Sequence, residues 1–282
     1  MASTWRAVIA GQIGAYHSEV GLDYEDACTV RPEESLDRPE PLVAVAVADG
    51  HGHARHFRSA RGSQLAVDIA TDLAFDVAGE IRRPDALRAA LHTRIGPELV
   101  ARWREAVEAD IADDPVTAVE LAAAGLPFDA TMEDKIYGYG STAMIALATP
   151  EWLLCAQIGD GDAFAITDGG HAIRLVPPDP LLDGWRTTSL CQADALSSLR
   201  YGVIRLDDSD IAAVMLATDG YGNAQPSTDW DDLFAADFAK LLTRHPVDRI
   251  AQALPRWVAA CASDEGSGDD VTVALLFRTA TP

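Results

Sequence analysis

Short apolar runs that end at an aspartate beside glycine restrict what this chain can fold into more than any other feature of its sequence. The runs are residues 42–48, 152–158 and 211–217, and each has the length and composition of a buried strand. They lead into Asp49-Gly50, Gly159-Asp160-Gly161 and Asp219-Gly220. One Asp-Gly pair is a common turn. Three of them at the ends of buried strands favour a cation site, because the carboxylates project from a sheet rim and glycine allows close backbone approach.

Apolar stripes of helical period lie between the strands, and they come in pairs. One stripe runs from Leu65 to Val77 in steps of four residues, and a second runs from Leu87 to Val107 with a kink expected at Gly96-Pro97. Two more stripes, within residues 233–242 and 250–258, precede a last strand at 271–277. Paired helices argue against a doubly wound parallel sheet, which has one helix after each strand. They predict an antiparallel α+β layering.

We expect a single domain over residues 1–282, because no linker separates two apolar cores. Residues 109–135 and 177–206 have weak periodicity and are predicted to be long connections. Loops of this length in a compact domain are usually functional. The segment 177–206 is therefore predicted to form a flap or loop near the site.

The charge balance excludes several kinds of partner. Lys and Arg number 22 against 44 Asp and Glu, which gives a net charge of −22, while 48% of the residues are hydrophobic. Nucleic acids and anionic membranes require clustered basic side chains, so we expect neither as a partner. No run approaches the roughly 20 apolar residues that span a bilayer. The four cysteines are scattered and no secretion signal is evident, so we expect a cytoplasmic monomer.

Two acidic pairs stand at the beginnings of strands, Glu25-Asp26 before residues 27–30 and Asp269-Asp270 before residues 271–277. In an antiparallel pair the start of one strand lies beside the end of its neighbour. Pairing of 27–30 with 42–48 would place Glu25-Asp26 next to Asp49. Pairing of 271–277 with 211–217 would place Asp269 next to Asp219. The acidic clusters are therefore predicted to converge on one rim.

Clustered carboxylates raise one another's pKa and need a compensating cation. Oxygen ligands suit Mg²⁺ or Mn²⁺, whereas zinc would want His or Cys at short spacing, and no such pattern occurs. An EF-hand is excluded because no Glu stands at the last position of a loop starting at Asp160. Two divalent ions about 3.5–4 Å apart, bridged by one carboxylate, would activate a water for in-line attack on phosphorus. Phosphoester hydrolysis is the predicted chemistry.

Six short motifs, in this order and at about this spacing, resemble those of the metal-dependent protein phosphatases of type 2C. They are Glu25-Asp26-Ala27, Asp49-Gly50-His51-Gly52, Gly140-Ser141-Thr142-Ala143, Ile158-Gly159-Asp160, Leu216-Ala217-Thr218-Asp219-Gly220 and Gly268-Asp269-Asp270-Val271-Thr272-Val273. The similarity extends from about Gly11 to Phe277. It implies a four-layer αββα sandwich, with two antiparallel sheets flanked by helical pairs. It also implies removal of phosphate from phosphoserine or phosphothreonine of a protein substrate with Mg²⁺ or Mn²⁺.

The resemblance also implies roles for individual residues. Asp49 matches the carboxylate that bridges two metal ions, and Gly50 a ligand through its carbonyl. Asp219 and Asp269 resemble ligands of one ion, and Glu25 a ligand of the second. Asp26 would orient water, and Asp160 matches a ligand of a weaker third ion. These seven positions are the expected metal residues: Glu25, Asp26, Asp49, Gly50, Asp160, Asp219 and Asp269.

His51 matches the general acid of the family, which would protonate the leaving serine or threonine oxygen. An imidazole suits this role because its pKa lies near neutrality. His53 and His56, further along, are expected at the surface or at the start of a helix.

The sequence departs from the family pattern at two positions. Gly21 stands where family members usually carry an arginine that binds the substrate phosphate, and Asp162 stands where an arginine is common. His17 is the nearest substitute for the first, and an ordinary surface histidine is the alternative. Two other functions therefore remain open. One is a catalytically weak or silent regulatory module that binds phosphoproteins, and the other is a phosphomonoesterase for small molecules.

Overall fold

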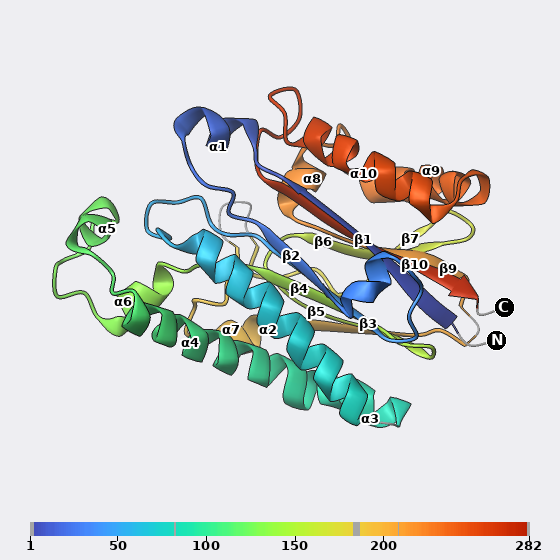
Figure 1. Cartoon of the computed structure of the whole chain (residues 1–282), viewed down its shortest axis with the longest axis horizontal. Coiled ribbons are helices and arrows are strands. Elements are labelled where there is room, and N and C mark those ends of the chain that lie inside the picture. The colour runs from blue at the N-terminus through green and yellow to red at the C-terminus, as the bar shows by residue number, and fades with distance from the viewer. Residues whose placement is uncertain (1–2, 82, 183–186, 208, 281–282) are drawn as a thin grey trace.

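The computed structural model describes residues 3–81, 83–182, 187–207 and 209–280, and these form two five-stranded antiparallel sheets packed face to face (Figure 1). The first sheet has the order β1 (Ser3–Gln12), β10 (Val271–Ala280), β9 (Ile211–Ala217), β6 (Asp162–Thr167) and β7 (Ala172–Arg174). The second has the order β2 (Ala27–Arg31), β3 (Val43–Ala48), β4 (Ala143–Ala148), β5 (Trp152–Ile158) and β8 (Arg200–Arg205). The predicted pairings of β2 with β3 and of β9 with β10 are both confirmed.

Helices cover the outer face of each sheet. On the second sheet lie α2 (Ser59–Glu80), α3 (Pro84–Ala90) and α4 (Gly96–Asp113), and on the first lie α9 (Trp230–Arg244) and α10 (Val247–Cys261). A π-helical turn over Leu91–Ile95 separates α3 from α4, so the helix is interrupted just before Gly96-Pro97, where the kink was expected. The predicted four-layer α+β sandwich is confirmed. None of the helices in the described part of the chain is long and apolar enough to cross a membrane.

The alternation of valine and alanine in β3 explains how one strand serves two cores. All six residues of β3 are buried. Val43, Val45 and Val47 point between the two sheets, whereas the alanines between them face the layer under α2. Successive side chains of a strand point to opposite faces, so the larger residues fill the space between the sheets and the small ones let α2 approach. A third apolar layer lies between the first sheet and α9 and α10.

The prediction of a long connection over residues 109–135 is wrong for much of its length. Helix α4 continues to Asp113, and two short helices follow, α5 (Ala118–Ala123) and α6 (Met132–Tyr137). Each short helix starts with a capping box, formed by Thr117 with Glu120 and by Thr131 with Asp134. A threonine followed three residues later by an acid is a start signal for a helix that can be read from the sequence.

The flap prediction does not hold for the whole of residues 177–206. Residues 200–205 form β8, which pairs with β5 at the edge of the second sheet, and α7 (Ala195–Ser198) precedes it. Thr188 and Ser189 are buried and hydrogen-bonded to Gly159 and Ser141. The described residues of this segment are therefore packed against the sheet, while residues 183–186 lie outside the described part.

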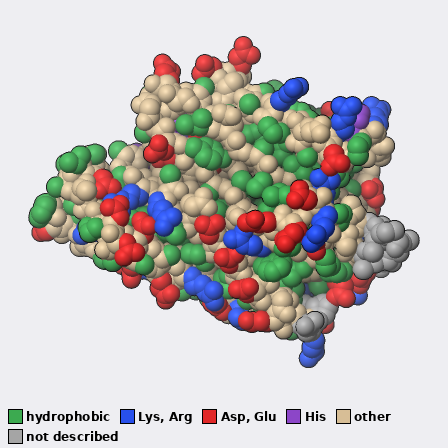
Figure 2. Space-filling model, in the orientation of Figure 1, with side chains coloured by type: hydrophobic (Ala, Val, Ile, Leu, Met, Phe, Trp, Pro, Cys, Tyr) green, Lys and Arg blue, Asp and Glu red, His purple; other side chains and the backbone are tan. Residues whose placement is uncertain are grey.

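Four strands, β1, β6, β7 and β8, and the short helices α1 (Ala15–Val20) and α8 (Asp219–Asn223) were not predicted. Acidic side chains are scattered over the face shown in Figure 2, with fewer basic ones among them, as the composition implies.

Candidate metal centre

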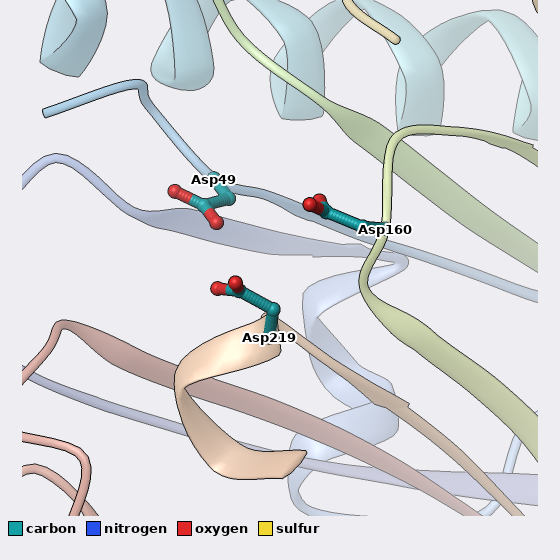
Figure 3. Close-up of side chains that lie close together, drawn as sticks. All are labelled: Asp49, Asp160 and Asp219. Carbon is teal, nitrogen blue, oxygen red and sulfur yellow. The ribbon is translucent and has the colours of Figure 1, made fainter. Parts of the chain in front are cut away.

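Three aspartates that follow strands converge at one end of the sandwich. Asp49 follows β3, Asp160 follows β5, and Asp219 follows β9 as the first residue of α8. Their carboxylates offer oxygens that all lie within 4.8 Å of one another. Figure 3 shows the three side chains pointing from separate strand ends toward one common space. Strands β3 and β5 both pair antiparallel with β4, so their ends reach the same rim of the second sheet, and the packing of the two sheets brings the end of β9 beside them.

Electrostatics at this cluster favour a bound cation. Burial raises the pKa of Asp49, and the neighbouring Asp26 and Asp219 raise it further. Burial and the charge of Asp160 likewise raise the pKa of Asp219. No Lys or Arg in the described ranges forms an ion pair with any of the three clustered aspartates. A hard divalent cation would supply the missing positive charge, since carboxylate oxygens are the ligands that such ions prefer.

Glu25 and Asp26 lie next to this cluster, each with one buried oxygen left free by the described residues. Glu25 Oε1 accepts a 2.6 Å hydrogen bond from the Ser59 hydroxyl, and its Oε2 has no partner. Asp26 is 5% exposed, and its Oδ2 accepts a 2.8 Å hydrogen bond from Thr218 while Oδ1 has no partner. Burying an unpaired carboxylate oxygen is costly, so these atoms fit a site completed by cations or their bound water.

Gly50 is needed where the chain passes between two backbone segments. Its N–H donates a 3.2 Å hydrogen bond to the Glu25 carbonyl, and a β-carbon there would lie 2.6 Å from that oxygen. A β-carbon would also lie 3.0 Å from the Ser59 carbonyl. The glycine therefore keeps Asp49 and Glu25 close to each other.

Asp269 lies outside the cluster of three, although its charge raises the pKa of Asp219. Its neighbour Asp270 is 3% exposed and accepts hydrogen bonds from the N–H groups of Gly14 and Glu25, at 2.8 and 2.6 Å. Asp270 thus fixes the backbone of Glu25. This positioning role was not predicted, since a carboxylate that binds backbone N–H groups has no sequence signature.

His17 is buried, with 6% of its surface exposed, and so the alternative of an ordinary surface histidine is wrong. Its Nδ1 lies 3.0 Å from the carboxylate of Asp270, and its Nε2 lies 3.8 Å from that of Asp269. The ring lines a cavity of about 330 Å³ together with Asp49, Gly50 and His51. The structure therefore places His17 beside the carboxylates of Asp269 and Asp270, in the cavity that Asp49 also lines.

His51 packs against His56, with ring centroids 4.7 Å apart. Burial, together with His56, lowers the pKa of His51 to about 3, so its imidazole is neutral in this state. The Nδ1 of His56 lies 2.7 Å from the Tyr137 carbonyl oxygen, and its ring stacks on Tyr137. His56 is half-buried three residues before α2, and it contacts His51, a contact that the sequence analysis did not foresee.

The two departures from the family pattern have different structural outcomes. Gly21 adopts a left-handed conformation, φ 75°, and ends α1. Asp162, by contrast, is paired with Arg174 on β7, at 2.5 Å, and Arg174 also contacts Asp231. Arg174 is therefore neutralised by two carboxylates and does not replace the arginine that is common at position 162.

The fold and the rim together define a β-sandwich protein with an acidic site suited to cations. Residues 13–259 match the family model described as protein phosphatase 2C. Because this match covers most of the chain, the protein belongs to the protein phosphatase 2C family.

One curated relative matches over nearly its whole length. Serine/threonine-protein phosphatase 3 of Escherichia coli (strain K12) is 26% identical over 284 residues, which covers 97% of this chain and 98% of the relative.

Two solved structures illustrate the likeness in fold. The catalytic domain of the serine threonine protein phosphatase PstP, in complex with two manganese ions, has a TM-score of 0.59 at 15% identity, covering 99% of this chain and 100% of that one. A bacterial serine phosphatase has a TM-score of 0.63 at 14% identity, covering 98% of each chain. At such low sequence identity, these matches show a shared fold and nothing further.

Proposed function

We propose that the protein is a metal-dependent phosphatase that removes phosphate from phosphoserine and phosphothreonine in proteins. The observation that carries the proposal is the convergence of Asp49, Asp160 and Asp219 within 4.8 Å on one rim. Membership of the protein phosphatase 2C family supports it, as does the relative named serine/threonine-protein phosphatase. The choice of ion, Mg²⁺ or Mn²⁺, follows from the oxygen ligands and from the manganese in a structural neighbour.

Seven residues would hold the ions. Asp49 would bridge two of them, with Asp219 and Asp269 serving one and Glu25 the other. The Gly50 carbonyl would be a further ligand, and Asp26 would orient metal-bound water. Asp160 would serve a third. Two divalent ions, when bound, neutralise the charge of the phosphate and lower the pKa of an attacking water.

The protein's own side chains then complete the reaction. His17 and His51 line the cavity beside Asp49, so both can face a phosphate group bound there. The negative phosphate would raise the pKa of His51, so that its imidazole takes up a proton from solvent and can then donate that proton to the leaving oxygen. Asp270 holds the Glu25 backbone and so keeps that carboxylate in place.

Hydrolysis of para-nitrophenyl phosphate and of phosphopeptides, measured with and without Mn²⁺, tests the proposal. We expect Mn²⁺-dependent turnover that EDTA abolishes. Asp219→Asn should lower it by more than about 100-fold, because loss of even an outer partner of a metal ligand costs about 10- to 100-fold. Asp76→Asn, at an exposed position on α2, is the matched control and should retain full activity.

The outcomes separate the three functions. Turnover of phosphopeptides supports the proposal, whereas efficient turnover of sugar phosphates or nucleotides alone would favour a small-molecule phosphomonoesterase. If no substrate is turned over with saturating Mn²⁺, the remaining function is the silent module that binds phosphoproteins. A cytoplasmic location and a monomeric state stay predictions, which fractionation and light scattering test.

A further inference from the structure

Large apolar side chains that face solvent gather on two segments of the described chain. Eleven such side chains are exposed, and seven of these lie on α1 and its end or on the segment that carries α5 and α6. The seven are Tyr16, Val20, Leu22, Val119, Phe128, Met132 and Tyr137. Phe128 is 84% exposed and Val119 is 78% exposed. We call residues 113–137 the α5–α6 lobe, and Figure 2 shows apolar and acidic side chains together on its tip at the left.

A groove of about 620 Å³ connects this lobe to the metal centre. Leu22 and Asp23 form one wall, residues 52–54 and 56–61 form the floor, and Asp110, Asp114 and Ala123 form the other wall. Glu25, one of the predicted metal residues, lines the same groove. A polypeptide whose phosphoresidue lies at the metal centre can therefore continue along the groove to the lobe.

The groove and the lobe are acidic. Asp23, Glu25, Asp110 and Asp114 line the groove, and both of its guanidinium groups are already engaged, since Arg58 contacts Glu120 and Arg61 contacts Asp110. The lobe contains six Asp and Glu and one Lys. Asp113 and Asp129 are exposed, and neither forms an ion pair with a described residue. Free carboxylates beside exposed apolar groups complement a basic and apolar partner.

The lobe is held in place against the floor of the groove. Arg58 donates a 2.7 Å hydrogen bond to Glu120 and another of 2.7 Å to the Asp114 carbonyl oxygen. Both lobe helices start with capping boxes. A surface fixed in this way loses little conformational entropy when a partner binds.

We propose that the groove and the α5–α6 lobe bind the substrate polypeptide on one side of its phosphoresidue and select segments that carry basic and apolar residues. The inference rests on the proposed phosphatase function and specifies its substrate class. A second copy of this chain fits poorly, because its net charge of −22 would be repelled by the acidic side chains of the groove and the lobe. A small phosphorylated metabolite would not reach the lobe.

The test measures turnover of three substrates. Two are phosphopeptides that share the same phosphoserine, and the third is para-nitrophenyl phosphate. One peptide carries Arg, Lys and Leu around the phosphoserine, and the other carries Asp and Ser. We expect kcat/KM to be about tenfold higher for the basic and apolar peptide, through KM. Asp113→Asn with Asp129→Asn should lower that value about fivefold and leave the small ester unchanged.

The apolar part of the surface is tested by a second pair of substitutions. Val119→Ser with Phe128→Ser should raise KM about fivefold for the same peptide, because two exposed apolar contacts are removed. Matched controls are Asp76→Asn on α2 and Leu233→Ser on α9, which lie outside the groove lining and should change nothing.

The result that overturns the inference is equal kcat/KM for the two peptides in the unmodified protein. An equal loss on the small ester and on both peptides in the lobe variants would overturn it as well, because a general folding defect acts on every substrate. Turnover of neither the ester nor any peptide would refute the proposed phosphatase function itself, together with this inference.

Discussion

The hydroxyl of Thr218 donates a 2.8 Å hydrogen bond to the buried carboxylate of Asp26. The same hydroxyl accepts a 2.9 Å hydrogen bond from the Thr272 N–H, and both threonines are fully buried. Thr218 directly precedes Asp219. One side chain thus joins the start of β2, the end of β9 and the start of β10 at the acidic rim.

Thr218→Val should destabilise the protein by about 1–3 kcal/mol, because it leaves the Thr272 N–H and one oxygen of Asp26 buried without a partner. Thr218→Ser keeps the hydroxyl and should recover most of the loss. Urea denaturation of the three proteins measures the difference in unfolding free energy. Equal stability of the valine and serine variants would show that this hydroxyl is not an important contact.

Gly50→Ala should abolish most phosphatase activity, since its β-carbon would lie 2.6 Å from the Glu25 carbonyl oxygen and force Asp49 and Glu25 apart. Gly79→Ala is the matched control, because a β-carbon there meets nothing within 4 Å and the residue lies in α2. This control should gain about 0.5–1 kcal/mol in stability from better helix propensity. The comparison uses Mn²⁺-dependent turnover and thermal unfolding, and normal turnover of Gly50→Ala would contradict the tight packing described here.

The two faces of β3 are sensitive to opposite changes in side-chain size. Val45→Ala removes volume between the sheets and should cost about 2 kcal/mol. Ala46→Val adds volume under α2 and should cost about 1–3 kcal/mol through overpacking. Denaturant unfolding measures both changes. Stabilisation by Ala46→Val would contradict the close packing of Ala46 under α2.

The pairing of Arg58 with Glu120 predicts a pH-dependent contribution to stability. Burial opposes ionisation of Glu120, but its hydrogen bonds to Arg58 and Thr117 prevail and lower its pKa to about 2. Because the folded pKa lies below the unfolded value, Glu120 stabilises the fold at neutral pH, and this contribution is lost as pH falls from about 4.5 toward 2.

Unfolding free energies of the unmodified protein and of Glu120→Gln, measured from pH 7 to pH 2.5, test this linkage. The difference should be largest above pH 5 and should shrink with acidification. A difference that is constant across this range would contradict the ion pair.

Burial decided how much of the fold could be predicted from the sequence. Strands such as β3, buried on both faces, appear as continuous apolar runs. Every residue of β8, by contrast, is partly exposed or exposed, because the strand lies at a sheet edge and so leaves no apolar run. The three residues of β7 are too few to show a period. These two edge strands therefore escaped prediction for a physical reason, whereas the edge strand β2 was predicted and the inner strand β6 was not.

The acidic rim was more predictable than the contacts that support it. Strand ends and antiparallel pairing place Asp49 and Asp160 at one rim of the second sheet, and the packing of the two sheets adds Asp219 from the first. The pairing of Asp162 with Arg174 depends on the register between β6 and β7, which the sequence does not specify. The burial of His17 likewise depends on α1 packing beside Asp270.

A crystal structure with Mn²⁺ soaked in, with the ions located by anomalous scattering, tests the central claim most directly. The account predicts manganese peaks on both sides of the Asp49 carboxylate, one of them also contacting Asp219. The claim would be contradicted by a structure in which Asp49 and Asp219 lie far apart, or in which manganese binds only elsewhere on the acidic surface.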